Sequence, residues 1–319
     1  MTIDLTDTTT GAIDSALNEA RRRLGGMTLG MVLTLIIVTD EAAQYDAIRS
    51  ANQAAREHPC RILAVIARRP KADSRLDAEI RVGEASPGET IVLRMYGPLG
   101  QHADSVVAPL LVPDVPVVTW WPDEGPEMPA KHPLGALAQR RVTDSAASDD
   151  PYETITALAS AYQPGDTDFG WTRATPWRSL LAATLDQAHP AITAGEVGAE
   201  QGNPTADLIA AWLTARLGVP VTRAVSAGPG ITSASFSTAE GDITITRADG
   251  RTATLAWPGR IDRMVSLHRR DTAELLAEEL RRLDPDEVYH ETLNQVLINA
   301  LPPEPPEPAE PDEGGVTRV

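Results

Sequence analysis

The chain has 319 residues, 42% of them hydrophobic, which is enough for two domains with buried cores and excludes a disordered tail or a coiled-coil rod. Its 28 basic and 45 acidic residues give a net charge of −17 at pH 7. A field of this sign repels phosphate backbones and anionic membrane surfaces, so we expect neither a nucleic-acid partner nor a membrane partner.

Cysteine content and the start of the chain indicate the cellular compartment. Cys60 is the only cysteine, which excludes an internal disulfide, a CxxC redox pair and a cysteine-cage metal site. The first residues are polar and acidic, and the longest apolar run, around residues 33–38, is far too short to cross a bilayer. We therefore expect a soluble, cytoplasmic protein.

The first recognisable elements form a βαβ unit. Residues 31–38 are a β-branched apolar run typical of a strand. Thr39-Asp40 offers an N-cap for a helix within residues 41–57, and residues 61–67 form a second apolar run suited to a strand buried on both faces.

An antiparallel pair follows. Residues 78–84 and 88–96 flank Ser86-Pro87-Gly88, which has the composition of a tight turn. A helix over roughly residues 101–111 then leads to another buried strand at residues 115–121. Strands interleaved with helices predict a mostly parallel, doubly wound sheet that closes near residue 150.

Different patterns mark the second half. Thr175 and Pro176 suit the cap and first position of a helix, and Asn203-Pro204 begins another that Gly218 ends. Asp271 and Glu274 form a capping pair, and Asp284-Pro285 opens a final helix. Between these helices, four strand-like segments joined by turn dipeptides predict an antiparallel meander; they are residues 231–238, 242–247, 251–257 and 260–267.

The predicted fold class is α/β, with an N-terminal doubly wound, mostly parallel sheet and a C-terminal α+β domain that carries the meander and the last helices. The acidic, small-residue stretch 145–150 is a plausible boundary between the two. We expect a flexible N-terminus with a short helix over 1–25, an α/β domain over 26–150, an α+β domain over 151–300 and a disordered proline-rich, acidic tail over 301–319.

Signatures of catalysis are missing from the sequence. Gly228-Pro229-Gly230 lacks the third glycine of a dinucleotide fingerprint and precedes a strand, and no P-loop, H-E-x-x-H or G-x-S-x-G motif occurs. No two histidines have the i, i+3 or i, i+4 spacing of helical metal ligands. We therefore expect no catalytic residue, cofactor or metal, and we interpret Cys60 as a buried apolar residue rather than a reactive thiol.

Two aromatic segments are candidates for binding. Trp120 and Trp121 end a strand predicted to be central, where they suit either a ligand or partner platform or a cap on the core. The segment WTRATPWR, residues 171–178, is the densest aromatic and basic cluster. It suits an anion site for a sugar phosphate or carboxylate, or two tryptophans that pin a helix while the arginines neutralise Asp166 and Asp168. His268-Arg269-Arg270 is a weaker basic spot, which we interpret as a solvated connection.

Longer segments resemble a known family. They closely resemble OpcA, the glucose-6-phosphate dehydrogenase assembly proteins of bacteria, in order from about residue 26 to residue 297. The segments are SANQAAREHPCRILAV, PVVTWWPDEGP, FGWTRATPWRSLLA, NPTADLIAAWLTARLGVPV and RRDTAELLAEELRRLDPDEVYHETL.

The resemblance implies a non-catalytic partner of glucose-6-phosphate dehydrogenase that promotes its active oligomer and acts as its allosteric activator, supporting the pentose phosphate pathway and NADPH supply. Photosynthetic relatives are linked to thioredoxin control, but Cys60 alone excludes an internal dithiol switch. The alternative is a module or enzyme that binds a sugar phosphate through the WTRATPWR arginines, and a metabolite effector is left open.

The resemblance assigns no interface residues, so the candidates rest on side-chain chemistry alone. We expect Trp121→Ala or Arg173→Ala to weaken activation of the enzyme without unfolding the chain. The candidates are Trp120, Trp121, Trp171, Arg173, Trp177 and Arg178.

Overall fold

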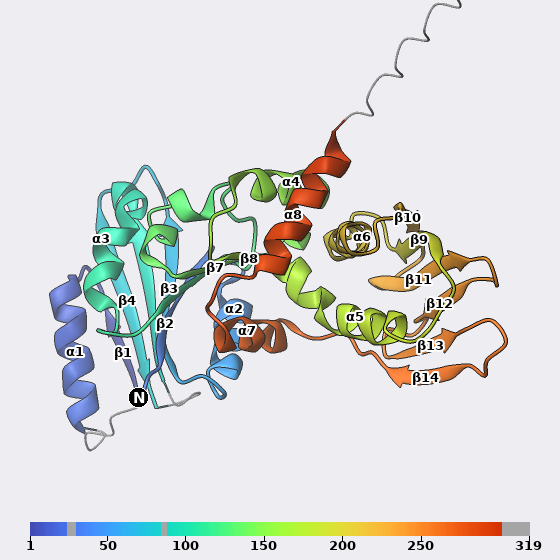
Figure 1. Cartoon of the computed structure of the whole chain (residues 1–319). Helices are drawn as coiled ribbons and strands as arrows, with labels where there is room; N and C mark the ends of the chain where they lie inside the picture. Colours follow the sequence, from blue (N-terminus) through green and yellow to red (C-terminus); the bar gives the residue numbers. More distant parts are fainter. Residues whose placement is uncertain (24–29, 84–87, 302–319) are drawn as a thin grey trace, which may run out of the picture.

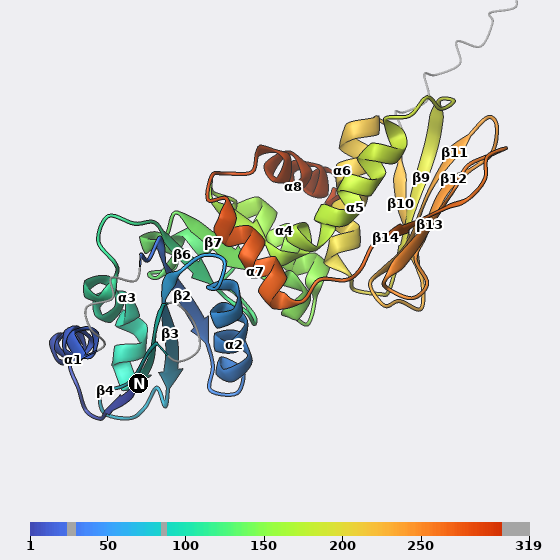
Figure 2. The same cartoon turned by 90° about the horizontal axis from the view of Figure 1, so that it is seen from below.

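A computed structural model describes residues 1–23, 30–83 and 88–301 and contains two sheets at opposite ends of an elongated molecule (Figure 1). Helices α4, α5, α7 and α8 lie in the region between the two sheets (Figures 1 and 2). The helices have the bounds α1 (Thr10–Arg23), α2 (Gln44–Ala54), α3 (Ala103–Val107), α4 (Pro151–Ala161), α5 (Phe169–Leu185), α6 (Pro204–Leu217), α7 (Thr272–Arg281) and α8 (Glu287–Ala300).

The first sheet is mostly parallel, as predicted, with the order β1-β4-β5-β3-β2-β6-β7-β8. Leu35 on β2 lies opposite Ile62 on β3 and opposite Val118 on β6, so apolar residues face each other across the sheet centre. Among the described strands of this sheet, β4 alone runs opposite to the others, and it pairs antiparallel with β5 on one side and with the edge strand β1 on the other. The strands are β1 (Thr2–Leu5), β2 (Leu33–Thr39), β3 (Cys60–Arg68), β4 (Arg75–Val82), β5 (Glu89–Tyr96), β6 (Val117–Trp120), β7 (Arg140–Thr143) and β8 (Asp166–Asp168).

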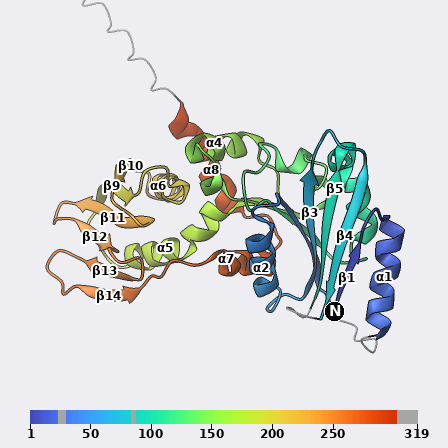
Figure 3. The same cartoon turned by 180° about the vertical axis from the view of Figure 1, so that it is seen from behind.

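Helices cover both faces of this sheet, which explains its nearly continuous apolar strands. Ile48 of α2 and Leu276 of α7 belong to the buried cluster on one face, and Leu17 of α1 and Val107 of α3 belong to the cluster on the other. Figure 3 shows α7 beside α2 and α1 on the opposite side of the sheet. The doubly wound arrangement is therefore confirmed.

The second sheet is mainly antiparallel, with the order β10-β9-β11-β12-β13-β14. The predicted meander is confirmed as β11 to β14, whereas β9 and β10, which pair in parallel, were not expected. Leu181 of α5 and Leu208 of α6 share a buried cluster with Phe236 of the sheet, so the two helices pack on one face. The strands are β9 (Ile192–Ala199), β10 (Val221–Val225), β11 (Ile231–Thr238), β12 (Ile243–Thr246), β13 (Thr252–Ala256) and β14 (Arg263–Ser266).

Capping signals place two helices correctly. Asn203 caps α6, Gly218 ends it with φ +66°, and Asp271 and Glu274 form the capping box of α7. The helix predicted after Thr39-Asp40 begins later, at Gln44, and α8 is capped by Asp286 rather than opened by Asp284-Pro285. The prediction that Thr175 caps a helix is wrong, because α5 begins at Phe169 and Asp168 accepts the capping hydrogen bond from the Gly170 N–H.

Pro176 therefore lies inside α5, where it cannot donate to the Thr172 carbonyl four residues earlier. The guanidinium of Arg270 donates to that carbonyl instead. A residue 98 positions along the chain thus compensates for the proline.

Several segments differ from the expected organisation. The short helix expected over residues 1–25 corresponds to α1, but β1 joins the first sheet and Ile13 and Leu17 of α1 are fully buried, so this segment is part of the folded domain. The helix expected over 101–111 is α-helical only in α3, with 3-10 turns on either side.

Two further elements cross the expected boundary at residue 150, since β8 completes the first sheet and α7 returns to that sheet's face. The turn at residues 86 and 87 and the tail from residue 302 lie outside the described residues. Within the parts that are described, no helix is both long and apolar enough to cross a membrane.

Candidate functional site

The four tryptophans among the candidate residues lie in the interior. Trp120 is fully buried against Phe169, with ring centroids 5.8 Å apart, and Trp121 packs edge-on against His132 at 5.4 Å. Trp171 and Trp177 are 2% and 3% exposed. A partner could touch these rings only if they left the core, so their part in an interface stays a prediction.

The two arginines of the cluster are already engaged. Arg173 makes a two-donor ion pair with Asp144, with both Nη–Oδ distances 2.6 Å. Arg178 stacks its guanidinium over the Trp171 ring, 3.6 Å from the centroid. The expected neutralisation of Asp166 and Asp168 by these arginines is not observed.

The two aspartates have other partners. Asp166 pairs with Arg141. Asp168 accepts hydrogen bonds from the Thr143 hydroxyl, the Ser145 N–H and hydroxyl, and the Gly170 N–H. Asp168 thereby ties the ends of β7 and β8 to the start of α5.

The usual ligand position of a doubly wound sheet is acidic here. That position is the carboxyl end of the strands where the strand order reverses, between β2 and β6. Thr39 donates to Asp123 across it at 3.1 Å, and the adjoining hollow contains Glu124, Asp144 and Asp150. Negative charge at this edge disfavours the phosphate of a nucleotide.

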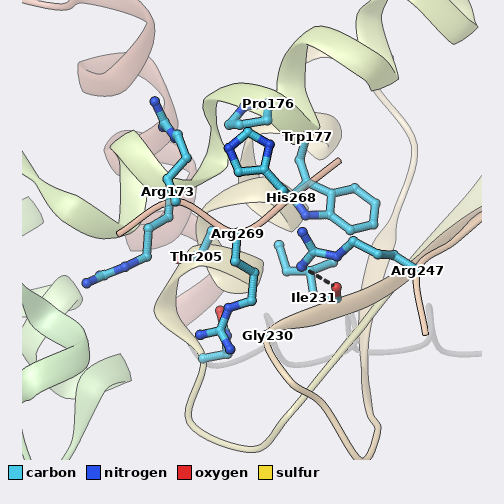
Figure 4. Close-up of a pocket in the computed structure, with 11 residues that line it drawn as sticks. Arg173, Pro176, Trp177, Thr205, Gly230, Ile231, Arg247, His268 and Arg269 are labelled. Carbon is cyan, nitrogen blue, oxygen red and sulfur yellow. Dashed lines mark hydrogen bonds between the residues drawn. The ribbon is translucent and has the colours of Figure 1, made fainter. Parts of the chain in front are cut away.

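A basic pocket lies farther along α5, where the chain approaches the second sheet (Figure 4). Its cavity volume is about 70 Å³. We call it the arginine pocket; its lining residues are Arg173, Pro176, Trp177, Asn203, Thr205, Gly230, Ile231, Arg247, His268, Arg269 and Arg270.

The arginine pocket is lined by residues from three segments that the sequence analysis treated separately. Arg173 comes from the aromatic cluster, residues 268–270 form the basic spot interpreted as a connection, and Gly230 belongs to the rejected glycine motif. Arg247, directly after β12, was missed, because a single arginine after an alternating strand gives no signal that it is buried. Its guanidinium lies 5.0 Å from the Trp177 ring centroid.

Metal and redox sites receive no support from the described ranges. In them, no three or more His, Cys, Asp and Glu side chains are grouped so that they could hold a metal ion. Cys60 is fully buried, and burial raises the pKa of its thiol to about 12. The interpretation of Cys60 as a buried residue is confirmed.

The fold and these sites define a two-lobed α/β protein whose lobes are joined by helices, with an arginine-rich pocket beside the joint. Two family models match it in succession. They describe the N-terminal domain and the C-terminal domain of a "Glucose-6-phosphate dehydrogenase subunit", and they cover residues 51–160 and 164–293 respectively. The chain belongs to this family, the OpcA family, as its sequence segments indicated.

A relative from Synechocystis sp., described as "Putative OxPP cycle protein OpcA", is 24% identical over 187 residues. The match covers 52% of this chain and only 39% of the relative's length.

Solved structures are more distant. The 3-ketoreductase KijD10 of Actinomadura kijaniata, in complex with NADP and TDP-benzene, is 13% identical with a TM-score of 0.48, over 83% of this chain and 95% of its own. An E. coli structure described as trehalose-6-phosphate bound with UDP-2-fluoro glucose is 10% identical with a TM-score of 0.26, over 61% and 65% of the two chains. Neither likeness bears on the function.

Proposed function

We propose that this protein is a non-catalytic assembly factor and allosteric activator of glucose-6-phosphate dehydrogenase, and that it supports the oxidative pentose phosphate pathway and NADPH supply. The observation that carries the proposal is the match of both family domains, in order, over residues 51–160 and 164–293. The two matched domains follow one another in the order that their names give.

The architecture is consistent with action through binding. An activator must bind one state of its enzyme more tightly than another, and about 1.4 kcal/mol of differential binding corresponds to a tenfold change in affinity. Surfaces held in a fixed relation favour such a difference because little conformational freedom is lost on binding. The helices between the two sheets provide that relation, since α8 packs against both α4 and α6 and α7 packs against both α2 and α5.

Among the six candidate residues, the half-buried arginines are better placed for a partner than the tryptophans. Arg173 and Arg178 retain partial exposure on α5, whereas the rings of Trp171 and Trp177 on the same helix are buried in the cluster that packs it against the second sheet. We therefore propose Arg173 and Arg178 as interface residues and give the tryptophans a positioning role.

The decisive experiment measures dehydrogenase activity against glucose 6-phosphate concentration, with the enzyme from the same cell, with and without this protein. We expect a saturation curve that shifts with the amount of added protein, and co-elution of the two proteins on a sizing column. An unchanged curve together with separate elution would overturn the proposal.

Arg173→Ala tests the proposed interface. We expect it to raise the concentration of protein needed for activation. The matched control is Arg216→Ala, which removes an exposed ion pair between α6 and Glu291 of α8 and should leave activation unchanged. Thermal unfolding of both variants separates a lost contact from a lost fold, and equal activation by folded Arg173→Ala would remove this residue from the interface.

The alternative function, a sugar-phosphate module clamped by the WTRATPWR arginines, is less well supported in its original form. Arg173 is paired with Asp144, whereas Arg178 lies over the Trp171 ring and donates to the Thr175 hydroxyl, so the two guanidiniums have separate partners and do not form one clamp.

A further inference from the structure

We propose that the arginine pocket binds the phosphoryl group of a small phosphorylated metabolite, with Arg247 and Arg269 as its principal ligands. The inference rests on the side chains of the pocket and does not depend on the proposed function.

Arg247 is a buried cation without an anionic partner among the described residues. The residue is 4% exposed, and its two Nη atoms donate to the carbonyls of Leu267, at 3.0 Å, and Ile231, at 2.8 Å. Its Nε is buried and has no hydrogen-bond partner in the same part of the chain. Because an unpaired buried charge is costly, a bound anion would stabilise this arrangement.

Arg269 brings a second guanidinium to the same place. Its side chain has neither an ion pair nor a hydrogen bond within the described part of the chain. A Cβ added at Gly230, whose φ is +67°, would lie 3.4 Å from Nη2 of Arg247 and 3.6 Å from Nε of Arg269. The two guanidiniums therefore flank this glycine, and Figure 4 shows the Arg269 side chain descending beside it.

In the described part of the chain, no carboxylate forms an ion pair with either of these two guanidiniums. Arg173 is neutralised by Asp144 and Arg270 by Glu278, and exposed His268 lies 3.7 Å from Glu274. Asp249 lies in a second hollow beside the arginine pocket, and its carboxylate accepts hydrogen bonds from the backbone N–H groups of Arg251 and Thr252.

Burial and the neighbouring charge of Arg269 both lower the pKa of Arg247, as expected for cations that share a site, while Asp249 opposes them. The first turn of α6, with Thr205 in the pocket wall, adds the positive end of a 14-residue helix.

The size of the pocket indicates the class of ligand. About 70 Å³ accommodates a phosphoryl group but not a whole sugar phosphate. The adjoining hollow shares His268 and Arg269 and is lined by Pro229, Gly250 and Ser266, so the rest of a ligand would lie there. Two guanidiniums present several N–H donors to the oxygens of a tetrahedral anion, which favours phosphate over a carboxylate.

The test is calorimetric titration of the full chain at constant ionic strength with inorganic phosphate, glucose 6-phosphate, glucose and acetate. We expect saturable binding of phosphate, tighter binding of glucose 6-phosphate, and none of glucose. Arg269→Gln should weaken binding about tenfold or more, the loss typical of one charge-assisted hydrogen bond. Arg263→Gln, an exposed arginine on β14 outside the pocket, should bind as the unmodified chain does.

Arg269 is exposed, so its replacement should not unfold the protein, and Arg269→Glu provides a second variant that reverses the charge. No saturable binding of either phosphate compound would overturn the proposal, as would equal affinity in Arg269→Gln or acetate binding as tight as phosphate. The dehydrogenase is absent from this titration, so the outcome of the titration is independent of the outcome of the activation assay.

Discussion

Arg140 on β7 and Glu279 on α7 are 139 residues apart and form a buried ion pair, in which Nε and Nη2 of the arginine lie 3.0 and 2.5 Å from one carboxylate oxygen. The other carboxylate oxygen accepts the Thr172 hydroxyl of α5 at 2.6 Å. One glutamate therefore joins the first sheet, the returning helix and the helix that reaches the second sheet.

Glu279→Gln should lower the free energy of unfolding by about 3 kcal/mol, because it leaves the Arg140 charge buried without its counterion. Urea unfolding followed by circular dichroism measures the change. Glu291→Gln, which removes an exposed ion pair with Arg216, is the control and should cost well under about 1 kcal/mol. Equal losses in the two variants would contradict the role assigned to Glu279.

The effects of Pro176→Ala and Arg270→Met on the free energy of unfolding should not be additive. Arg270→Met leaves the Thr172 carbonyl without its donor, whereas an alanine at 176 supplies the missing helical N–H. We expect Arg270→Met to cost about 1 kcal/mol less in the Pro176→Ala background. Loss of the Arg270 pair with Glu278 occurs in both backgrounds and cancels, so strict additivity would show that the guanidinium does not replace the proline's donor.

The thiol of Cys60 should be inert in the folded protein. Burial raises its pKa to about 12, so at pH 8 the thiolate population falls about a thousandfold relative to an ordinary cysteine. Ellman's reagent should detect no thiol in the native chain and one thiol in urea. Rapid reaction of the native protein would show that Cys60 is accessible, and Cys60→Ala provides the blank.

The buried carboxyl of Asp168 should make stability depend on pH. Burial, assisted by the charge of Asp144, raises its pKa to about 6 from an ordinary value near 3.8. The folded state then holds the proton more tightly than the unfolded state. Asp168 therefore adds to the free energy of unfolding at low pH, and this addition is lost as pH rises through about 6.

Between pH 5 and 7, the titration of Asp168 should lower the free energy of unfolding by about 1 kcal/mol. Urea unfolding of the unmodified chain and of Asp168→Asn at both pH values isolates this effect, because the variant cannot titrate at position 168. The same pH dependence in both proteins would show that other groups are responsible.

The sequence by itself determined the elements whose signals are local. Apolar runs placed β2 and β3, the turn dipeptides placed β11 to β14, and the caps Asn203 and Asp271 placed the starts of α6 and α7. These features depend on residues within a few positions of one another, so their patterns are legible along the chain.

Tertiary structure decided the rest. In sequence, Trp120 and Trp177 suit either a binding surface or the core, and only the packing of Phe169 and Arg247 against them decides for the core. The start of α5 was mispredicted because Pro176 is a local break signal. Arg270 overrides that signal from 98 positions beyond the carbonyl to which it donates.

The arginine pocket likewise exists only in the fold. Gly230, Arg247 and Arg269 come from three separate segments, and each is unremarkable on its own strand or turn. Long-range contacts bring their charges together and bury one of them, and neither proximity nor burial is encoded in the periodicity of any single segment.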